Sequence, residues 1–321
     1  MNTIKFIMAA RCEAAGRPNN EDNFQLTDHL SGNQWSFIAD NEIDLDDKGA
    51  LLIVCDGMGG MNAGEVASKT AVETIKDWFS AERLTGEVIA SSESIMRYIE
   101  KAIVAADAKI KEEGENDREK EGMGSTIVLA WIIGQSAFIG WCGDSRAYCF
   151  NAATGLKRLS HDHSYVQSLV DSGQLSEELA FSHPYSNIIT RCLGDPSQAA
   201  KPDVKEYPLH NGDVIMLCSD GLCGVLRDCE IEAAMSENPD SMAACRDALW
   251  DASFNAGWND NVTIGLCRIV SGCEQNVSSH ENVTTQEETK KRPNKKMITR
   301  LIAGIIIVGI IAGIVITKFF K

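Results

Sequence analysis

Acidic side chains recur at the ends of apolar runs in this chain, and this placement is the pattern that most directly suggests chemistry. Runs rich in β-branched and aromatic residues are typical of strands, and strand ends can bring distant side chains to one edge of a sheet. Carboxylate oxygens are hard ligands that select Mg²⁺ or Mn²⁺ over zinc or copper. The candidate metal ligands are Glu21 and Asp22 in RPNNEDNF, Asp56 after LLIVC, Asp144 after AFIGWCG, Asp220 after VIMLCS and Asp260 before NVTIGLC.

Glycines adjoin three of these aspartates. Gly57, Gly143 and Gly221 each lie next to an acidic residue of the set. A glycine permits close approach of the backbone, and its carbonyl can itself be a ligand, so the Gly57 carbonyl joins the candidate ligands. A single aspartate at a strand end is more often a turn former or a helix cap. The metal-site interpretation therefore depends on the number of acids and on the glycines beside them.

The elements that must position these residues are mostly strands. Apolar segments bounded by Gly and Asx predict them at ALLIVCDG, STIVLAWIIG, SAFIGWCGD, RAYCFN, DVIMLCSDG and NVTIGLCRI, with Gly134 and Gln135 as the turn of a hairpin. Helical spacing predicts helices over residues 64–79, 92–113 and 241–255. The pattern indicates an α+β fold of two packed antiparallel sheets covered by helices, in one domain.

Eight segments resemble, in order, the motif series of the bacterial type 2C (PPM) metal-dependent serine/threonine protein phosphatases. They are RPNNEDNF, VCDGMGGMNAGEVAS, GMGST, GDSRAY, LSHDHS, HPYSNIITRCLGD, LCSDGL and NDNVTI. One such motif would mean little, but the ordered series spans residues 10 to 270. The resemblance implies a four-layer α-β-β-α sandwich as the catalytic domain, residues 1–270, with a dinuclear metal centre in a cleft at one end.

The resemblance also implies a role for each candidate ligand. By motif position, Asp56 should bridge two Mg²⁺ or Mn²⁺ ions. The other implied ligands are the Gly57 carbonyl with Glu21 or Asp22 at one or other ion, Asp220 and Asp260 at the partner ion, and Asp144 beside Asp220 at a weaker third ion.

The implied activity is hydrolysis of phosphoserine and phosphothreonine in proteins. Two metal ions lower the pKa of a bridging water, so a hydroxide can attack phosphorus in line without a phosphoenzyme. Arg17 matches the position at which a guanidinium fork grips the phosphate, although by itself it would read as a solvated surface residue. Met58 stands where eukaryotic relatives carry a His thought to protonate the leaving group, so a metal-bound water is the candidate acid.

Two further motifs superficially resemble metal sites. His161 and His163 in SHDHS fall in a motif that precedes the mobile flap of the family, which we expect in residues 165–194, so we interpret them as structural loop histidines. Flap sequence, rather than the metal centre, should tune substrate choice. Residues 44–49, DLDDKG, resemble an EF-hand loop, but Lys48 replaces an acidic ligand, which favours an acidic loop between strands.

Charge and cysteine usage exclude several classes of protein. The chain has a net charge of −16, and residues 271–321 hold eight Lys and Arg against four Asp and Glu, which leaves −20 on residues 1–270. Such an acidic body is a poor nucleic-acid binder. The eleven cysteines form no CxxC pair and many lie in apolar runs, as reduced cytosolic cysteines do.

The C-terminal segment differs in kind from the rest. Residues 301–317, LIAGIIIVGIIAGIVIT, are an uncharged run at the short end of what can span a bilayer. Basic residues are concentrated before this run, which predicts a single-pass membrane protein with residues 1–300 in the cytoplasm. Residues 271–300 are polar and unpatterned, as in a flexible linker, and residues 318–321 form a short tail. A buried core helix and a GPI signal are the less favoured alternatives.

The predicted partners follow from both parts of the chain. They are phosphorylated proteins, namely substrates and kinases of a Ser/Thr kinase pathway, and the cell membrane through the C-terminal helix. One alternative is a catalytically dead scaffold of the same fold that binds phosphoproteins, although such proteins usually lose metal ligands and none is missing here. Another keeps the chemistry but takes phosphotyrosine, or a regulatory phosphoprotein such as an anti-sigma antagonist.

Overall fold

The computed structural model describes residues 3–59 and 63–275, which fold around two sheets. The first sheet has the strand order β3-β1-β13-β12-β8-β9 and the second β10-β7-β6-β4-β2, with β5 paired to β4. The strands of the first sheet are β1 (Lys5–Glu13), β3 (Ile43–Asp44), β8 (Arg146–Asn151), β9 (Gly155–Arg158), β12 (Val214–Cys218) and β13 (Val262–Ser271). Those of the second are β2 (Asp22–Thr27), β4 (Ala50–Met58), β5 (Gly124–Ser125), β6 (Ile127–Ile133), β7 (Ser136–Cys142) and β10 (Asp203–Pro208). All strand pairs within the two sheets are antiparallel.

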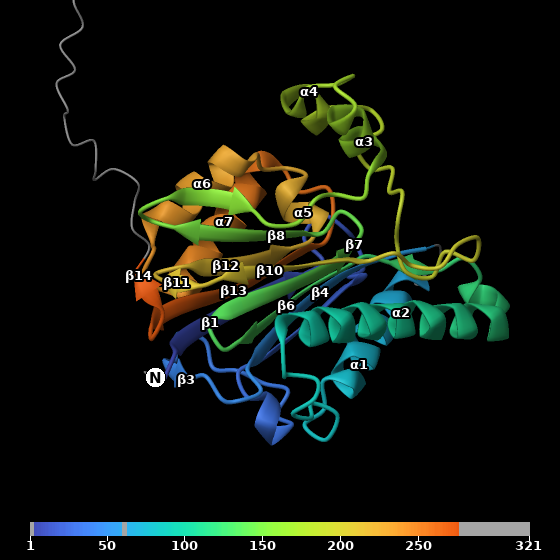
Figure 1. Cartoon of the computed structure of the whole chain (residues 1–321). Helices are drawn as coiled ribbons and strands as arrows, with labels where there is room; N and C mark the ends of the chain where they lie inside the picture. The colour runs from blue at the N-terminus through green and yellow to red at the C-terminus, as the bar shows by residue number, and fades with distance from the viewer. Residues whose placement is uncertain (1–2, 60–62, 276–321) are drawn as a thin grey trace, which may run out of the picture. The chain divides into compact units, whose positions relative to one another are not determined.

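Helices cover the outer face of each sheet, which makes four layers (Figure 1). The second sheet packs against α1 (Ala63–Trp78) and α2 (Ser92–Asn116), and the first against α5 (Asp220–Cys223), α6 (Asp228–Glu237) and α7 (Met242–Ala256). Apolar side chains of both sheets fill the space between the two sheets and form a further part of the core. The expected α-β-β-α sandwich of two antiparallel sheets flanked by helices is confirmed.

The buried strands carry apolar residues on both faces because each face meets a different layer. In β4, Leu51 and Ile53 pack towards α1 and α2, whereas Leu52 and Val54 lie in the core between the sheets. The sequence of a strand that is covered on both faces is a continuous apolar run rather than an alternation of apolar and polar residues. This is why the runs in the sequence located β4, β6, β7, β12 and β13 correctly.

The predicted turns and helices also have clear counterparts. Ile133 pairs with Ser136 across the predicted hairpin turn, where Gly134 has a φ of 55°. The three expected helices correspond to α1, α2 and α7. Residues 44–49 form a turn in which the Asp46 carboxylate accepts the backbone N–H groups of Lys48 and Gly49, so this stretch is an acidic loop between strands.

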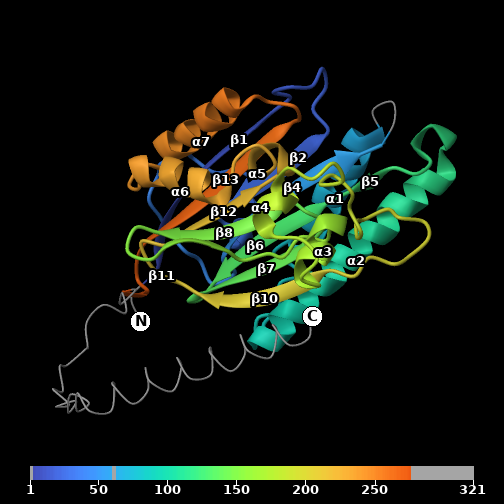
Figure 2. The same ribbon diagram turned by 90° about the horizontal axis from the view of Figure 1, so that it is seen from above.

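A long excursion connects β9 to β10 and carries the expected flap, residues 165–194. It contains α3 (Tyr165–Asp171) and α4 (Glu177–Phe181), which stand off the body of the sandwich in Figure 1 and overlie it in the view from above in Figure 2. The excursion closes on itself at its base, since the Tyr165 N–H donates to the Ile188 carbonyl at 2.8 Å. The flap is therefore anchored at a narrow stem and presents α3 and α4 beyond it.

Regular structure continues past residue 270, where the predicted catalytic domain ends. β13 runs to Ser271, and β14 (Glu274–Gln275) pairs in parallel with β11 (His210–Asn211). The Asn211 amide also exchanges two hydrogen bonds with the backbone of Cys273, at 2.8 and 3.0 Å. Within residues 3–59 and 63–275 no helix is long and apolar enough to cross a membrane, and the predicted span at residues 301–317 lies outside the described residues.

Candidate active site

The predicted acids are brought together by strand register at one end of the sandwich. Asp22 begins β2 and lies directly opposite Asp56 near the end of β4. In the other sheet, β12 pairs antiparallel with β13, so the chain just after β12 and the chain just before β13 fall at the same edge. Asp220 lies two positions after the end of β12, and Asp260 lies two positions before the start of β13. Antiparallel pairing thus converts distant sequence positions into one acidic group.

Asp22 is buried and held by hydroxyl groups on one side only. Its Oδ2 atom accepts hydrogen bonds from the hydroxyls of Ser219 and Thr263, both at 2.7 Å. Its Oδ1 atom is buried and has no partner among the described residues. Burial raises the pKa of Asp22 to about 7, although the two hydroxyls stabilise the charged form and oppose this shift. A buried carboxylate oxygen without a donor is costly, which favours a bound cation beside it.

Asp56 and Asp220 lie close enough for the charge of one carboxylate to affect the other. Burial, reinforced by neighbouring carboxylates, raises the pKa of both groups, and that of Asp56 well above its usual range. Asp220 also has a buried Oδ1 without a partner in the described part of the chain. A cation bound beside these two carboxylates would neutralise their charge.

Asp144 belongs to the same group. It follows β7 after Gly143, whose φ of 125° is a conformation that favours glycine, and only 8% of its surface is exposed. Burial, with Asp220 and Asp162 nearby, raises the pKa of the Asp144 carboxyl well above its ordinary value. The Asp144 carboxylate is therefore close enough to Asp220 to interact with it electrostatically.

Glu21 and Gly57 are joined through the backbone. The Gly57 N–H donates to the Glu21 carbonyl at 3.2 Å, and the Glu21 N–H donates to the Asn261 side chain at 2.8 Å. A Cβ atom on Gly57 would lie 2.1 Å from the carbonyl oxygen of Gly64 in α1. Only glycine therefore allows β4 and the start of α1 to approach this closely, which explains the glycine beside Asp56 in physical terms.

Arg17 stands at the rim of the acidic group. Its Nη2 donates to Oδ2 of Asp260 at 2.8 Å, and its Nε donates to the Asn259 carbonyl at 3.0 Å. The Arg17 side chain remains 54% exposed. A cavity of about 790 Å³ opens here, and Arg17, Asp144, Asp220 and Asp260 line it together with residues of α3, α4 and α6.

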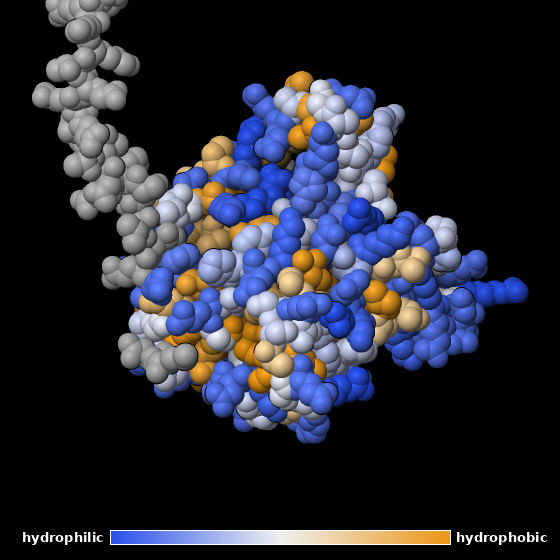
Figure 3. Space-filling view, in the orientation of Figure 1, coloured by the Kyte–Doolittle hydropathy of each residue, from blue (hydrophilic) through white to orange (hydrophobic). Residues whose placement is uncertain are grey.

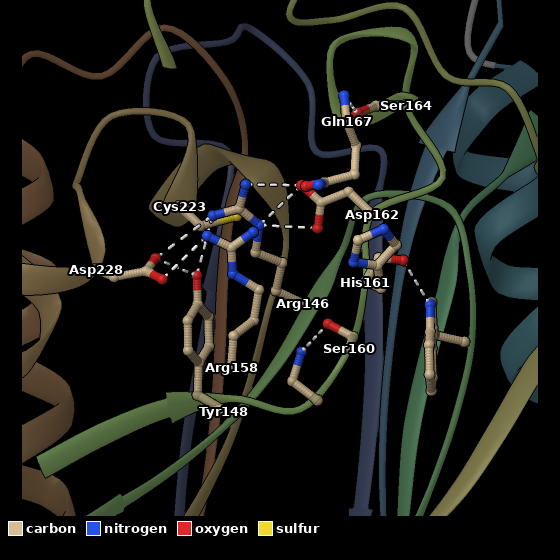
Figure 4. A network of polar contacts seen from close by, with 12 residues as sticks. Arg146, Tyr148, Arg158, Ser160, His161, Asp162, Ser164, Gln167, Cys223 and Asp228 are labelled. Carbon is tan, nitrogen blue, oxygen red and sulfur yellow. Dashed lines mark hydrogen bonds and ion pairs between the residues drawn. The ribbon is translucent and has the colours of Figure 1, made fainter. Parts of the chain in front are cut away.

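A buried ionic network forms a further wall of this cavity and was not predicted from the sequence (Figure 4). Arg146 donates to both carboxylate oxygens of Asp162, with the shortest contact, from Nη2, at 2.7 Å. Tyr148 Oη and Arg158 donate to the two oxygens of Asp228, at 2.9 and 3.0 Å. The sequence does contain the Arg, Tyr and Asp residues of this network, inside GDSRAY and SHDHS. Neither segment alone shows that these side chains contact one another.

The sequence of this chain is similar to that of a known protein family. The sequence matches the profile of the Protein phosphatase 2C family over residues 21–257, which is most of the chain. The chain belongs to the protein phosphatase 2C family. The predicted resemblance to the bacterial members of this family is confirmed.

Individual relatives agree with the family assignment. The chain is 32% identical to serine/threonine phosphatase stp of Listeria innocua over 221 residues, which cover 68% of this chain and 84% of the relative. The structure of the serine/threonine phosphatase Stp1 from Staphylococcus aureus is similar, with a TM-score of 0.70, 29% identity, and coverage of 83% of this chain and 95% of that one. The catalytic domain of the phosphatase PstP, crystallised with two manganese ions, matches with a TM-score of 0.67, 27% identity, and coverage of 84% and 100%.

The side chains of this family member are suited to hard cations, although not preassembled around one. Within residues 3–59 and 63–275, no three His, Cys, Asp or Glu side chains are arranged to hold an ion as they stand. The Asp56 carboxylate interacts electrostatically with Asp220, Asp22 and Asp144. The donors are nevertheless all oxygen atoms, and two of them, Oδ1 of Asp22 and Oδ1 of Asp220, are buried without a partner. A pair of divalent cations fits this donor set.

The two loop histidines have protein partners. His163 is buried; its Nδ1 accepts the Gly143 N–H at 3.2 Å, and its Nε2 lies 3.2 Å from the Asp203 carboxylate. His161 Nε2 lies 2.9 Å from the carboxylate of Asp171 in α3. Both rings are thus hydrogen-bonded within the loop that leads into the flap, as expected for structural histidines.

Proposed function

We propose that this chain is a metal-dependent protein phosphatase that hydrolyses phosphoserine and phosphothreonine at the acidic end of the cavity. The observation that carries the proposal is the group of carboxylates with two buried oxygens, at Asp22 and Asp220, that have no partner in the described chain. Asp220 also lines the cavity that Arg17 lines. Burying several carboxylates without counter-charges is costly unless the site is built to bind cations. The naming of its relatives as serine/threonine phosphatases supports the substrate class.

The proposed ligands of two Mg²⁺ or Mn²⁺ ions are oxygen donors only. Asp56 would be shared, because it interacts with Asp22 on one side and with Asp220 on the other. The remaining proposed donors are Glu21, Asp22, the Gly57 carbonyl, Asp220 and Asp260, with Asp144 at a weaker third ion. When bound, the ions would supply positive charge that polarises the phosphate and lowers the pKa of water.

The residues of the chain would bind and orient the substrate. Arg17 already donates two hydrogen bonds to oxygen atoms, and its exposed guanidinium edge faces the cavity, so it can donate to phosphate oxygens. Asn261 fixes the loop that carries Glu21, since its amide donates to the carbonyls of Ala14 and Asn19 at 2.9 and 2.7 Å. The acidic group is therefore held by backbone contacts rather than by mobile side chains alone.

The proposal includes a location for this activity. Residues 301–317 would span the cell membrane, with residues 1–300 in the cytoplasm and the polar segment before the span acting as a linker. Its support is the uncharged run and the six basic residues that precede it within residues 290–300. Tethering would raise the effective concentration of the enzyme towards phosphoproteins and kinases of a Ser/Thr kinase pathway at the membrane.

Phosphate release by the full-length chain tests the proposed activity. Detergent-solubilised protein is mixed with a phosphothreonine peptide and Mn²⁺, and free phosphate is measured with and without EDTA. We expect release that EDTA abolishes and that excess Mn²⁺ restores. A chain that binds the peptide but releases no phosphate would instead support the scaffold function, and release from phosphotyrosine alone would overturn the substrate class.

A further inference from the structure

Four arginines line the cavity, and one of them differs from the others in its partners. Arg17, Arg146 and Arg158 are each ion-paired with an aspartate. Arg227, at the start of α6, makes no ion pair with any residue of the described chain. Its guanidinium carbon instead lies 4.6 Å from the ring centroid of Phe181 in α4. Of the four arginines that line the cavity, Arg227 is therefore the one whose charge is not neutralised by an ion pair within the described chain.

The contact with Phe181 orients Arg227 without occupying its donors. An arginine that stacks its face on an aromatic ring keeps the N–H groups at its edge available for a carboxylate or phosphate. The Glu230 carboxylate accepts the backbone N–H of Arg227 at 2.8 Å, and it makes no ion pair with the Arg227 side chain in the described chain. Arg227 is also exposed, so a ligand can reach it.

The other charges on this side of the cavity make the attraction local. Asp228 is committed to Arg158 and Tyr148. Glu177 and Glu178 are exposed at the start of α4 and would repel an anion placed near them. Hydrophilic side chains predominate between the flap and the body in the space-filling view (Figure 3). On the side of the cavity away from Arg17, a negative group on a ligand is thus attracted where it can reach Arg227.

We infer that Arg227 is a specificity-determining residue that binds an anionic side chain of the substrate at a distance from the phosphate to be hydrolysed. The inference rests on the proposed phosphatase function. The candidate metal ligands Asp220 and Asp260 line the same cavity as Arg227, so one extended peptide can contact both. The anion is a Glu or Asp carboxylate or a second phosphate, because these are the planar or multidentate acceptors that a guanidinium fork matches.

A peptide series tests this assignment with the full-length chain and Mn²⁺. Each phosphothreonine peptide has neutral flanks except for one Glu, or one phosphoserine, moved along successive positions on either side. We expect one position at which Glu raises kcat/KM roughly threefold to tenfold over the neutral peptide, as a pair at a partly exposed site would. The phosphoserine arm shows whether a second phosphate is preferred to a carboxylate there.

Variants decide whether Arg227 causes the preference. We expect Arg227→Gln to bring the ratio of kcat/KM for the acidic and neutral peptides close to one, and Arg227→Lys to keep part of it. Phe181→Leu should weaken the preference, because the stacked orientation is lost. Arg83→Gln is the matched control, since Arg83 also lies over an aromatic ring, that of Trp78 at 5.7 Å, but does not line the cavity. Its ratio should equal that of the wild type.

The outcomes separate this inference from the proposed function. A wild-type ratio near one at every position, or an unchanged ratio in Arg227→Gln, would overturn the role of Arg227 while phosphatase activity persists. Fluorescence anisotropy with the same labelled peptides measures binding without turnover. If no peptide is hydrolysed but binding still prefers the acidic peptide through Arg227, the phosphatase proposal fails and the assignment of Arg227 stands.

Discussion

Arg17 is fixed in place before any substrate binds. Asp260 and the Asn259 carbonyl hold two of its three guanidinium nitrogens, at 2.8 and 3.0 Å. A guanidinium that is already positioned loses less side-chain entropy when it engages a phosphate. The same contact places a positive charge beside a candidate metal ligand, so Arg17 couples phosphate binding to the acidic group.

Substitution of Arg17 should weaken phosphate recognition more than it weakens the fold. We expect Arg17→Ala to lower kcat/KM for a phosphothreonine peptide by roughly 10²-fold, and Arg17→Lys by about tenfold, because lysine keeps the charge but loses the fork. Steady-state kinetics on the full-length chain measure this. The control is Arg97→Ala, an exposed arginine on α2 paired only with Glu93. Wild-type kinetics in Arg17→Ala would contradict the role of Arg17.

His163 is built into the fold as a neutral ring. Its Nδ1 accepts the Gly143 N–H, so the proton of the neutral ring lies on Nε2, which faces Asp203. Protonation of Nδ1 would break the contact with Gly143. Burial lowers the pKa of His163 from its ordinary value of 6.5, and Arg191 acts in the same direction, whereas Asp203 opposes it.

The sign of the resulting pH dependence follows from this lowered pKa. The unfolded chain binds a proton at His163 at a higher pH than the folded chain, so the stability from the neutral ring is present above about pH 6.5 and is lost as the pH falls through the folded-state pKa. We expect the free energy of unfolding of the wild type, relative to that of His163→Gln at the same pH, to decrease on acidification from pH 7.5. The raised pKa values of Asp22, Asp56 and Asp220 act on both proteins alike and cancel in this difference. Denaturant unfolding of both proteins at each pH gives the slopes. Equal slopes would show that His163 does not titrate in this way.

At the scale of elements, close backbone approach decides where the strand ends meet. The turn from β12 into α5 passes so near the start of β13 that a Cβ on Gly221 would lie 1.8 Å from the Asn261 carbonyl oxygen. That contact is with backbone, which cannot move aside as a flexible side chain can. The turn therefore fixes Asp220 relative to Asp260.

A glycine comparison tests this packing. We expect Gly221→Ala to lower the free energy of unfolding by about 2–4 kcal/mol, as overpacking against rigid backbone does. Gly86→Ala is the matched control, because a Cβ there would meet no atom within 4 Å, and it should change stability by less than about 0.5 kcal/mol. Urea unfolding in EDTA removes any contribution from bound ions. Equal stabilities of the two variants would contradict the close approach.

The sequence predicted elements better than it predicted their tertiary partners. Apolar runs located β4, β6, β7, β12 and β13 because burial on both faces leaves a signal in every residue. β1 was missed, since Arg11 interrupts its apolar residues and the pairing with β13 that defines it is not local. The short helices α3 and α4 bury little and so show almost no periodicity.

In the candidate site, too, individual residues could be predicted from the sequence but their tertiary partners could not. Asp56 and Asp220 could be proposed from strand ends, but the electrostatic interaction between them depends on the packing of two sheets. The pairing of Arg146 with Asp162 and the unpaired state of Arg227 in the described chain are likewise tertiary facts. No spacing rule within one segment could have given them, because each partner comes from a different element.

At the scale of the whole molecule, the proposed enzyme joins a folded phosphatase domain to a membrane span. The tether adds no contact to the active site, so it should change where the enzyme acts rather than how fast it acts on a free peptide. We expect a chain that ends at residue 300 to leave the membrane fraction while its kcat/KM for a soluble phosphothreonine peptide changes less than about twofold. Fractionation of cells expressing either form measures this. Retention of the shortened form in membranes would contradict the span at residues 301–317.

Orientation in the membrane is tested separately. In inside-out vesicles the folded domain should be open to added protease, because the basic residues before the span predict a cytoplasmic location. Protection of the domain in such vesicles would reverse the proposed topology.

The most direct test of the metal-dependent phosphatase is a joint measurement of bound Mn²⁺ and turnover in wild type and Asp56→Asn. Asp56 interacts with Asp22, Asp144 and Asp220, so removing its charge should weaken binding of both ions. We expect wild type to bind two Mn²⁺ ions per chain, with a weaker third, and to release phosphate. Asp56→Asn should remain folded but lose bound Mn²⁺ and at least about 10²-fold in kcat. Undiminished turnover in Asp56→Asn, or no Mn²⁺ bound by wild type, would contradict a catalytic metal centre at these carboxylates.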